Sequence, residues 1–417
     1  MKFKKIHSGL IALGLCCSLF LQTPVLAAEE TADAAAVSAI STNDIAGWPQ
    51  GPDITSTAAV IMEDSTNTTL YAKNMEQVLY PGATVKVMTT LLALENTQLS
   101  DQVTMTATGV SGVTDGGANI SAQIDEVFTV EQCLYAIMLA SANDVALQLA
   151  EHIGGSVDGF VQMMNARATE LGCTNTVFTN PTGLPDENQH TTAHDMALIM
   201  KAAADNESFQ TIASTTSYTI PATNVSGGDR VLTNNFSMLT NTNAAYYQYC
   251  TGGREGYTEA SGSTLVCSAQ KNGITLIAVV LQGTSGTTAT EAASLLNYGF
   301  DNFNMLSLGD NDFNMLSGGD VYVPVGTTAD ALTTQDGKVQ DGQYSRQYLF
   351  GGTAVGTSVM AATQEEDTSL VDASVQNIDA ARNYTEGRNN LPYFIIGGVG
   401  ILLLLLILLR IIKVAKS

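Results

Sequence analysis

The chain has 417 residues, of which 45% are hydrophobic and 14% are charged, so it is long and apolar enough to bury a sizeable core. Acidic residues outnumber basic ones by 40 to 17, which gives a formal net charge of −23. A surface of this sign repels nucleic acid and anionic lipid head groups, and the composition therefore argues against either as a partner.

Residues 1–28 have the pattern of a secretory signal peptide. Three lysines among the first five residues precede an apolar run from 9 to 21, and Val25–Ala28 supplies a small-residue cleavage site. An N-terminal membrane anchor is the alternative, disfavoured because the apolar run is short. Residues 29–51 are rich in Ala, Ser, Thr and Asp, which predicts a flexible lead-in.

Residues 52–304 have the pattern of one globular domain of the α/β (α+β) class. Between its early and late β segments the chain has helical periodicity, including 85–94, 144–152, 159–171 and a helix after Thr192, which with Asp195 makes a predicted capping box. A closing helix is expected at 290–303. The predicted β segments are 55–62, 69–72, 246–254, 264–269 and 274–281. These elements predict one antiparallel sheet flanked by helices, with a helical insert between its strands.

The C-terminal part is expected to contain four further segments. Residues 305–363 alternate apolar and polar positions with glycine turns, which predicts a small all-β domain, and the ten residues 301–310 are repeated at 311–320. An acidic spacer is predicted at 364–391 and a transmembrane helix at 392–412, because about 20 apolar residues cross a core of ~30 Å. The basic tail 413–417 is expected in the cytoplasm, which predicts a single-pass protein of the cell membrane with an extracytoplasmic domain.

Four cysteines follow the signal peptide, and their spacing has no metal-binding C-x-x-C pattern. We therefore expect no metal and no cofactor. Cys250 and Cys267 lie on segments predicted to be neighbouring antiparallel strands, so they could face each other and form a disulfide. Free thiols are the alternative for these two and for Cys133 and Cys173.

Three short motifs in a fixed order would together form a serine acyl-transfer site. In S-x-x-K the serine and lysine lie one helical turn apart, so the lysine can accept the serine proton. An S-x-N loop and a K-T-G strand complete the cleft, and the latter binds a substrate carboxylate. Here the second motif is intact as Ser141, Ala142 and Asn143.

The surroundings of this motif make it specific. The stretches Val130–Asp144, Met164–Asn165, Asn180–Pro185 and Thr192–Met196 follow one another in an order that resembles the serine-type D-alanyl-D-alanine carboxypeptidases, peptidase family S11 (low-molecular-mass penicillin-binding proteins). The resemblance covers about residues 53–298. It implies a DD-peptidase/β-lactamase-like fold with a small β domain behind it. It also implies a ligand, the peptidoglycan stem peptide ending in D-Ala-D-Ala.

The first motif departs from the family pattern. Where the family has Pro-Ala-Ser-x-x-Lys, this chain has Pro81–Lys86, with Lys86 on the base position and Ala83 on the nucleophile position. Thr84 is the nearest hydroxyl. It is rotated by ~100° around a helix from position 83, so we do not expect it to reach the same point.

The third motif departs as well, because Arg254, Glu255 and Gly256 replace Lys-Thr-Gly. Arginine keeps the positive charge but changes its shape. Glu255 replaces a hydroxyl donor with an anion that repels a ligand carboxylate. Alternatively, Glu255 could pair with Lys86 or Arg254 across the cleft and close it.

The sequence therefore predicts a degenerate site. Lys86, Ser141 and Asn143 occupy the family's catalytic positions, whereas Arg254, Glu255 and Gly256 occupy its substrate-binding positions. Two changes in one cleft favour a natural inactive homologue over an engineered substitution at Ala83. The expected role is binding or regulation in cell-wall metabolism, with the stem peptide or a cell-wall synthesis protein as partner. An active carboxypeptidase with an unusual nucleophile is the alternative, and a β-lactamase is a weaker third choice because it needs the same serine.

Overall fold

A computed structural model of the chain describes residues 40–113, 117–309 and 314–362. The predicted signal peptide (1–28), residues 29–39, the acidic spacer, the transmembrane segment (392–412) and the tail lie outside the described residues. Within these ranges no helix combines the length and the apolar character needed to cross a membrane.

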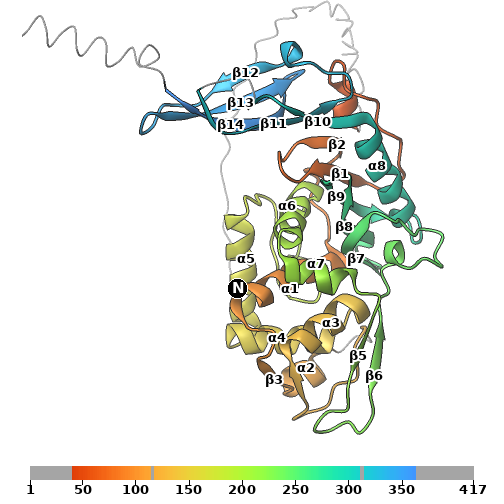
Figure 1. The fold of residues 1–417 in the computed structure, drawn as a ribbon. Helices are drawn as coiled ribbons and strands as arrows, with labels where there is room; N and C mark the ends of the chain where they lie inside the picture. The colour runs from red at the N-terminus through yellow and green to blue at the C-terminus, as the bar shows by residue number, and fades with distance from the viewer. Residues whose placement is uncertain (1–39, 114–116, 310–313, 363–417) are drawn as a thin grey trace, which may run out of the picture. The chain divides into compact units, whose positions relative to one another are not determined.

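The centre of the described chain is a five-stranded antiparallel sheet with the order β2-β1-β9-β8-β7 (Figure 1). Its strands are β1 (Ala58–Glu63), β2 (Thr69–Lys73), β7 (Cys250–Thr258), β8 (Gly262–Lys271) and β9 (Ile274–Gly283). The predicted sheet of two early and three late strands is confirmed. The predicted first late strand began about four residues too early, because residues 246–249 lie outside the sheet and β7 extends to the short 259–261 turn.

Both faces of this sheet are buried. Along β1, Ala58, Val60 and Met62 pack with the helical insert, and the intervening Ala59 and Ile61 face the other way, toward the helix α8 (Thr288–Asn302). All six residues of β1 are buried, as expected for a strand covered on both sides. The predicted closing helix is therefore confirmed as the cover of one face.

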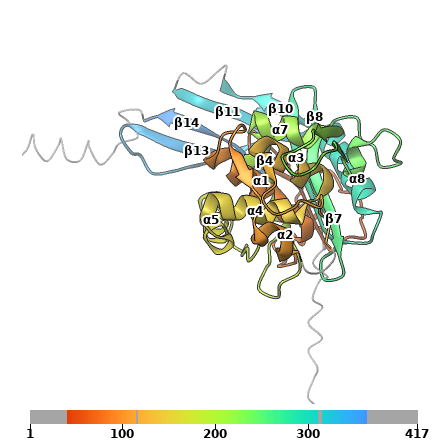
Figure 2. The same ribbon diagram turned by 90° about the horizontal axis from the view of Figure 1, so that it is seen from below.

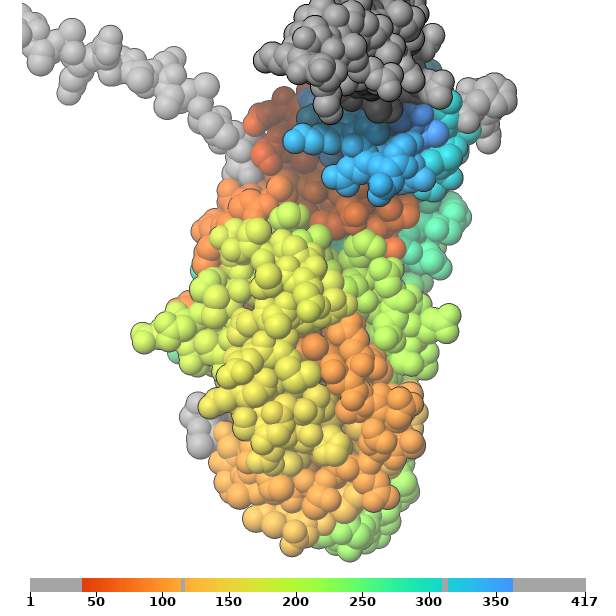
Figure 3. Space-filling model, turned by 90° about the vertical axis from the view of Figure 1, so that its left-hand side faces the viewer, coloured from red at the N-terminus to blue at the C-terminus, as the bar shows by residue number. Residues whose placement is uncertain are grey.

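The helical insert lies between β2 and β7 in the sequence and covers the other face of the sheet. Its helices are α1 (Val85–Asn96), α2 (Ala107–Gly112), α3 (Val130–Ala140), α4 (Asn143–Gly154), α5 (Val157–Glu170), α6 (Ala193–Ala204) and α7 (Glu207–Ser214). Two short antiparallel strand pairs accompany them, β3 (Gln102–Thr104) with β4 (Val127–Thr129) and β5 (Ser217–Ile220) with β6 (Arg230–Thr233). Figure 2 shows α1, α3 and α4 grouped beside one another, and α5, yellow in Figure 3, lies on the surface.

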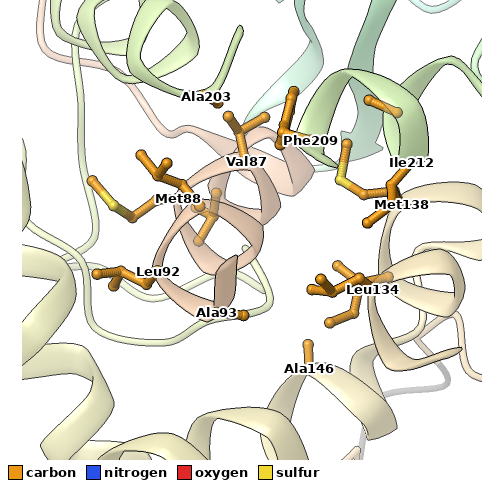
Figure 4. Close-up of a cluster of buried hydrophobic side chains, with 14 of the residues drawn as sticks. Val87, Met88, Leu92, Ala93, Leu134, Met138, Ala146, Ala203, Phe209 and Ile212 are labelled. Atoms are coloured by element: carbon orange, nitrogen blue, oxygen red, sulfur yellow. The ribbon is translucent and has the colours of Figure 1, made fainter. Parts of the chain in front are cut away.

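Helix α1 is the centre of the larger hydrophobic core. Val87 points from it toward Ala203 of α6 and Phe209 of α7, whereas Met88 and Leu92 lie on the opposite side of α1 from Leu134 of α3 (Figure 4). Each such side chain contributes roughly 1.5–3 kcal/mol when it is fully buried. The packing fixes the direction of α1, and therefore fixes where its first turn points.

The helix caps differ in part from expectation. Thr192 caps α6 by accepting a hydrogen bond from the Asp195 backbone N–H at 3.0 Å, but the predicted capping box is only half present. The Asp195 carboxylate instead accepts from the Asn175 N–H and the Thr176 hydroxyl. A complete capping box occurs at Thr129, at the start of α3.

A second five-stranded sheet, with the order β10-β11-β14-β13-β12, confirms the expected small β domain. Its strands are β10 (Phe303–Ser307), β11 (Met315–Pro324), β12 (Thr333–Asp336), β13 (Gln343–Phe350) and β14 (Thr353–Ala361). The sequence repeat spans the connection from β10 to β11. The second half of β11 pairs with β10, whereas its first half, from the second copy, pairs with β14.

Residues 40–51 do not form the flexible lead-in that composition predicted. Trp48 is 4% exposed, its indole N–H donates to the Leu70 carbonyl at 2.9 Å, and its ring lies 5.0 Å from Phe303 and 6.0 Å from Phe350. Ile40 is buried as well. Burial of these apolar side chains outweighs the polar composition around them, because a large aromatic group dominates local packing energy.

The predicted disulfide between Cys250 and Cys267 is absent, and all four cysteines of the described residues are free thiols. The two strands are antiparallel neighbours as expected. The register of the two strands, which follows from the short 259–261 turn, places Cys250 opposite Ala269 and Cys267 opposite Gly253. The cysteines are consequently not direct cross-strand partners.

Candidate functional site

A cleft of about 500 Å³ lies between the edge strand β7 and the helical insert. All seven residues that the sequence singled out line it, namely Ala83, Lys86, Ser141, Asn143, Arg254, Glu255 and Gly256. Segments separated by more than 170 residues in the sequence therefore meet at one site. Among the residues that the structure describes, no cluster of three or more His, Cys, Asp or Glu side chains is placed to hold a metal ion.

The short turn η2 (Gly82–Thr84) forms the floor of the cleft and leads directly into α1. The backbone packs closely there, since a Cβ atom at Gly256 would lie 2.5 Å from the Ala83 Cβ, and one at Gly183 would lie 1.9 Å from the Gly82 carbonyl oxygen. Glycine at these two positions lets β7 and the 183 loop approach the Ala83 backbone.

The neighbouring Thr84 does not replace the missing nucleophile. Thr84 is buried, and its hydroxyl donates to the Pro81 carbonyl at 2.7 Å instead of facing the cleft. The expectation that Thr84 cannot take the place of residue 83 is confirmed.

Lys86 lies on the first turn of α1 and is 1% exposed. Its ammonium donates to the Asn143 side-chain oxygen at 2.7 Å and to the Thr182 carbonyl. Burial lowers the pKa of Lys86 well below its ordinary value of 10.5, and the positive charge of Arg254 lowers that pKa further. Both effects favour the neutral amine, the form that can accept a proton.

Ser141 and Asn143 join α3 to α4. Ser141 follows the last residue of α3 in a left-handed conformation (φ 58°), which ends that helix and turns the chain so that α4 begins at Asn143. The Asn143 backbone N–H donates to the Ala118 carbonyl at 2.8 Å, and its side chain binds Lys86. The intact second motif is therefore rigidly connected to the lysine of the first.

The loop Asn180–Pro185 forms a further wall that was not predicted as part of the site. Asn180 orders it by accepting hydrogen bonds from the backbone N–H groups of Thr182 and Gly183. The Pro181 carbonyl accepts from Thr89 of α1, and the Thr182 carbonyl accepts from Lys86. The Asn-Pro-Thr-Gly pattern signals a tight turn, but nothing in it indicates which helix the turn contacts.

Arg254 is 2% exposed, and its Nη1 donates to the Met138 carbonyl and to the Asn235 side-chain oxygen, both at 2.8 Å. Burial lowers the pKa of Arg254 to about 10, against the opposing effect of the Glu255 charge. Its Nε is enclosed and has no hydrogen-bond partner within the described ranges. The guanidinium therefore anchors β7 to the end of α3 and to the segment around Asn235.

Glu255 pairs with neither Lys86 nor Arg254, so the alternative in which it closes the cleft is wrong. Its two carboxylate oxygens accept from the Ser237 backbone N–H at 2.8 Å and from the Ser237 hydroxyl at 2.9 Å. Neighbouring residues of a strand point to opposite sides, which directs Glu255 away from the lysine. Asn235 lies in an irregular segment and Ser237 begins the short 3-10 helix η3 (Ser237–Leu239), and no motif in the sequence indicates that either residue belongs to the site.

The arrangement is that of a DD-peptidase-type cleft. It differs in having Ala83 at the nucleophile position of the floor and Arg254 and Glu255 in place of Lys-Thr on strand β7. The D-alanyl-D-alanine carboxypeptidase family model, Peptidase S11, matches residues 46–285, more than half of the chain. The chain therefore belongs to the peptidase S11 family of D-alanyl-D-alanine carboxypeptidases.

Individual relatives agree with this assignment. The carboxypeptidase DacF of Bacillus subtilis is 33% identical over 254 residues, which are 59% of this chain and 62% of that protein. The carboxypeptidase of Streptomyces sp. strain K15 is 31% identical over 266 residues, 60% of this chain and 88% of that protein. The chain thus spans somewhat under two thirds of the Bacillus relative's length.

Solved structures show the same fold. The Streptomyces K15 DD-transpeptidase superposes with a TM-score of 0.57 at 28% identity, covering 61% of this chain and all of that structure. Penicillin binding protein 6B of Escherichia coli superposes with a TM-score of 0.63 at 23% identity, covering 76% of this chain and 98% of that structure. The fold is accordingly a mixed α/β DD-peptidase-like fold.

Proposed function

We propose that this chain binds peptidoglycan stem peptides in its cleft without cleaving them, as an extracytoplasmic member of its family with a binding or regulatory role in cell-wall metabolism. The observation that carries the proposal is Ala83, whose methyl group stands at the cleft floor where the family has its serine. The hydroxyl of the next residue, Thr84, is bonded to the Pro81 carbonyl.

The magnitude of this loss supports a non-catalytic role. Removing the nucleophile of a serine hydrolase lowers kcat by on the order of 10⁶. Lys86 keeps the shifted pKa of a proton acceptor, but no hydroxyl at position 83 is present to give it a proton. The preserved contact between Lys86 and Asn143 maintains the shape of the cleft, which suits binding.

Labelling of the full-length protein with a fluorescent penicillin tests the proposal, together with an assay of D-Ala release from a D-Ala-D-Ala pentapeptide. We expect neither a covalent adduct nor released D-Ala, while an active family member gives both under the same conditions. A stoichiometric adduct mapped to Thr84 or Ser141 by mass spectrometry would establish the alternative, an active carboxypeptidase with an unusual nucleophile.

The proposed location rests on the two ends of the sequence. The signal pattern of residues 1–28 supports export, and the apolar segment 392–412 followed by basic residues supports a C-terminal anchor in the cytoplasmic membrane. Protease added to intact protoplasts should remove the domain and spare a tag placed after Ser417. Digestion of the tag with survival of the domain would show the inverse orientation.

A further inference from the structure

The positive charges of the cleft are directed into the protein. Among the described lining residues, only Lys86, Arg254 and Glu255 carry a formal charge. The Lys86 ammonium donates to two protein oxygens, as does Nη1 of Arg254. Both side chains are at least 98% buried, and the Arg254 Nε is enclosed. These groups are poorly placed to bind an incoming carboxylate.

Glu255 differs because it is partly exposed within the cleft and keeps unused acceptor capacity. A carboxylate has about four lone-pair sites, and Ser237 occupies one site on each oxygen. The remaining sites can only accept hydrogen bonds. A ligand group beside Glu255 therefore has to offer an N–H or O–H donor.

We propose that this cleft selects peptides whose end beside Glu255 carries a carboxamide or an ammonium group, and discriminates against a free terminal carboxylate. The inference rests on the proposed binding function and names its ligand class. A carboxamide N–H can donate to Glu255, whereas a carboxylate would place a second anion against it without a proton between them. The hydrogen bonds of Lys86 to Asn143 and to the Thr182 carbonyl direct its side-chain nitrogen toward protein oxygens, so it is poorly placed to offset this repulsion.

The test compares two ligands that differ only at this end. Calorimetric titration of the full-length protein with a D-Ala-D-Ala pentapeptide and with its C-terminal carboxamide measures the preference directly. We expect the carboxamide to bind about tenfold tighter or more, since like charges at contact distance are strongly unfavourable in a partly desolvated site. Tighter binding of the carboxylate form would overturn this inference and leave the proposed function standing. Binding of neither peptide would overturn the proposed function itself.

Three variants assign the preference to Glu255. Glu255→Gln removes the charge at nearly constant shape and should reduce the difference between the two peptides to about twofold or less, because the charge repulsion is gone. Glu259→Gln removes a charge from the exposed turn after β7, outside the cleft, and should leave the preference unchanged. Ser237→Ala removes only the hydroxyl donor to Glu255, leaves the hydrogen bond from the backbone N–H and keeps the charge, so the carboxamide preference should persist. An unchanged preference in Glu255→Gln would refute the assignment to Glu255.

Discussion

The hydrophobic core and the cleft are built from the same helices but obey different constraints. Val87, Met88 and Leu92 of α1 pack into the core, while Lys86, at the start of the same helix, faces the cleft. Helix α3 likewise buries Leu134 and ends at the cleft with Ser141. The core depends on many apolar positions at helical spacing, whereas the chemistry of the cleft depends on a few single residues. A single substitution can therefore remove the chemistry and leave the fold intact.

The largest expected effect is the return of acylation. Ala83→Ser places a hydroxyl one helical turn from Lys86 and should allow slow covalent labelling by penicillin, detected by intact-mass spectrometry, where the parent chain gives none. Adding Glu255→Thr should raise D-Ala release further, because it removes a like charge beside the peptide carboxylate. A mutant cycle separates the two contributions.

The matched control is Thr84→Ser, which keeps a hydroxyl that bonds to Pro81 and should gain no labelling. Lys86→Met in the Ala83→Ser background should abolish the penicillin labelling that Ala83→Ser gains. If Ala83→Ser with Glu255→Thr folds but neither acylates nor releases D-Ala, the cleft is not the preserved remnant that its geometry indicates.

The second effect concerns the core. Leu134→Ala should lower the free energy of unfolding by about 2–5 kcal/mol, because Leu134 is fully buried and its loss leaves a cavity. Denaturant unfolding measures the change, and the folded protein should keep its peptide affinity. Leu99→Ala is the control, since Leu99 is 36% exposed and should change stability by less than about 0.5 kcal/mol. An equal loss in both variants would contradict the described core.

The third effect is a pH dependence of stability, and it concerns Lys86, which lies where the hydrophobic core meets the cleft. Burial, and then Arg254, hold the folded-state pKa of Lys86 below its unfolded value of 10.5, so the folded protein binds fewer protons than the unfolded chain between these two pKa values. The contribution of Lys86 to stability should therefore rise with pH in that window, by at most about 1.4 kcal/mol per pH unit. Lys86→Met should remove this rise, which unfolding measurements between pH 7 and 9.5 would reveal.

Lys201→Met is the matched control for this slope. Partial burial opposes the charge of Lys201, but Asp64 and Asp205 raise its pKa above 10.5. Its stabilising contribution is thus fully present below pH 10.5, so it should stay constant across the same range. A Lys86→Met slope identical to that of the parent chain would show that Lys86 titrates alike in the folded and unfolded states.

The smallest effect is expected at the start of α3. Thr129→Ala removes one half of the capping box with Gln132 and should cost about 1 kcal/mol of stability. Because this end of α3 is remote from Ser141, the variant should bind peptides as the parent chain does. Thermal unfolding and the same calorimetric titration measure both quantities. A clear loss of affinity would show that the two ends of α3 are coupled.

The sheet, most helices and the identity of the cleft residues could be predicted because each follows from local periodicity or a short motif. The positions of Asn235 and Ser237 could not, since they are set by the long-range packing of residues 234–239 against β7. Glu255 shows the limit most clearly. The negative charge of Glu255 follows from the sequence, but its hydrogen-bond partner, Ser237, depends on the side of β7 on which the side chain lies. The burial of Trp48 was not predicted because the prediction for residues 29–51 used their average polar composition, in which one large apolar side chain has little weight.

The repeated decapeptide has a consequence for how this chain tolerates changes in length. Ser307 of β10 pairs with Asp320, the last residue of the second copy, and Leu306 pairs with Val321, the residue that follows it. A chain without residues 311–320 would place Asp310 opposite Ser307, aspartate for aspartate, and Leu308-Gly309 would close a two-residue turn. Loss of the second copy would thus keep the register of β10 against the rest of β11, but it would remove Met315, Ser317 and Gly318, which pair with β14.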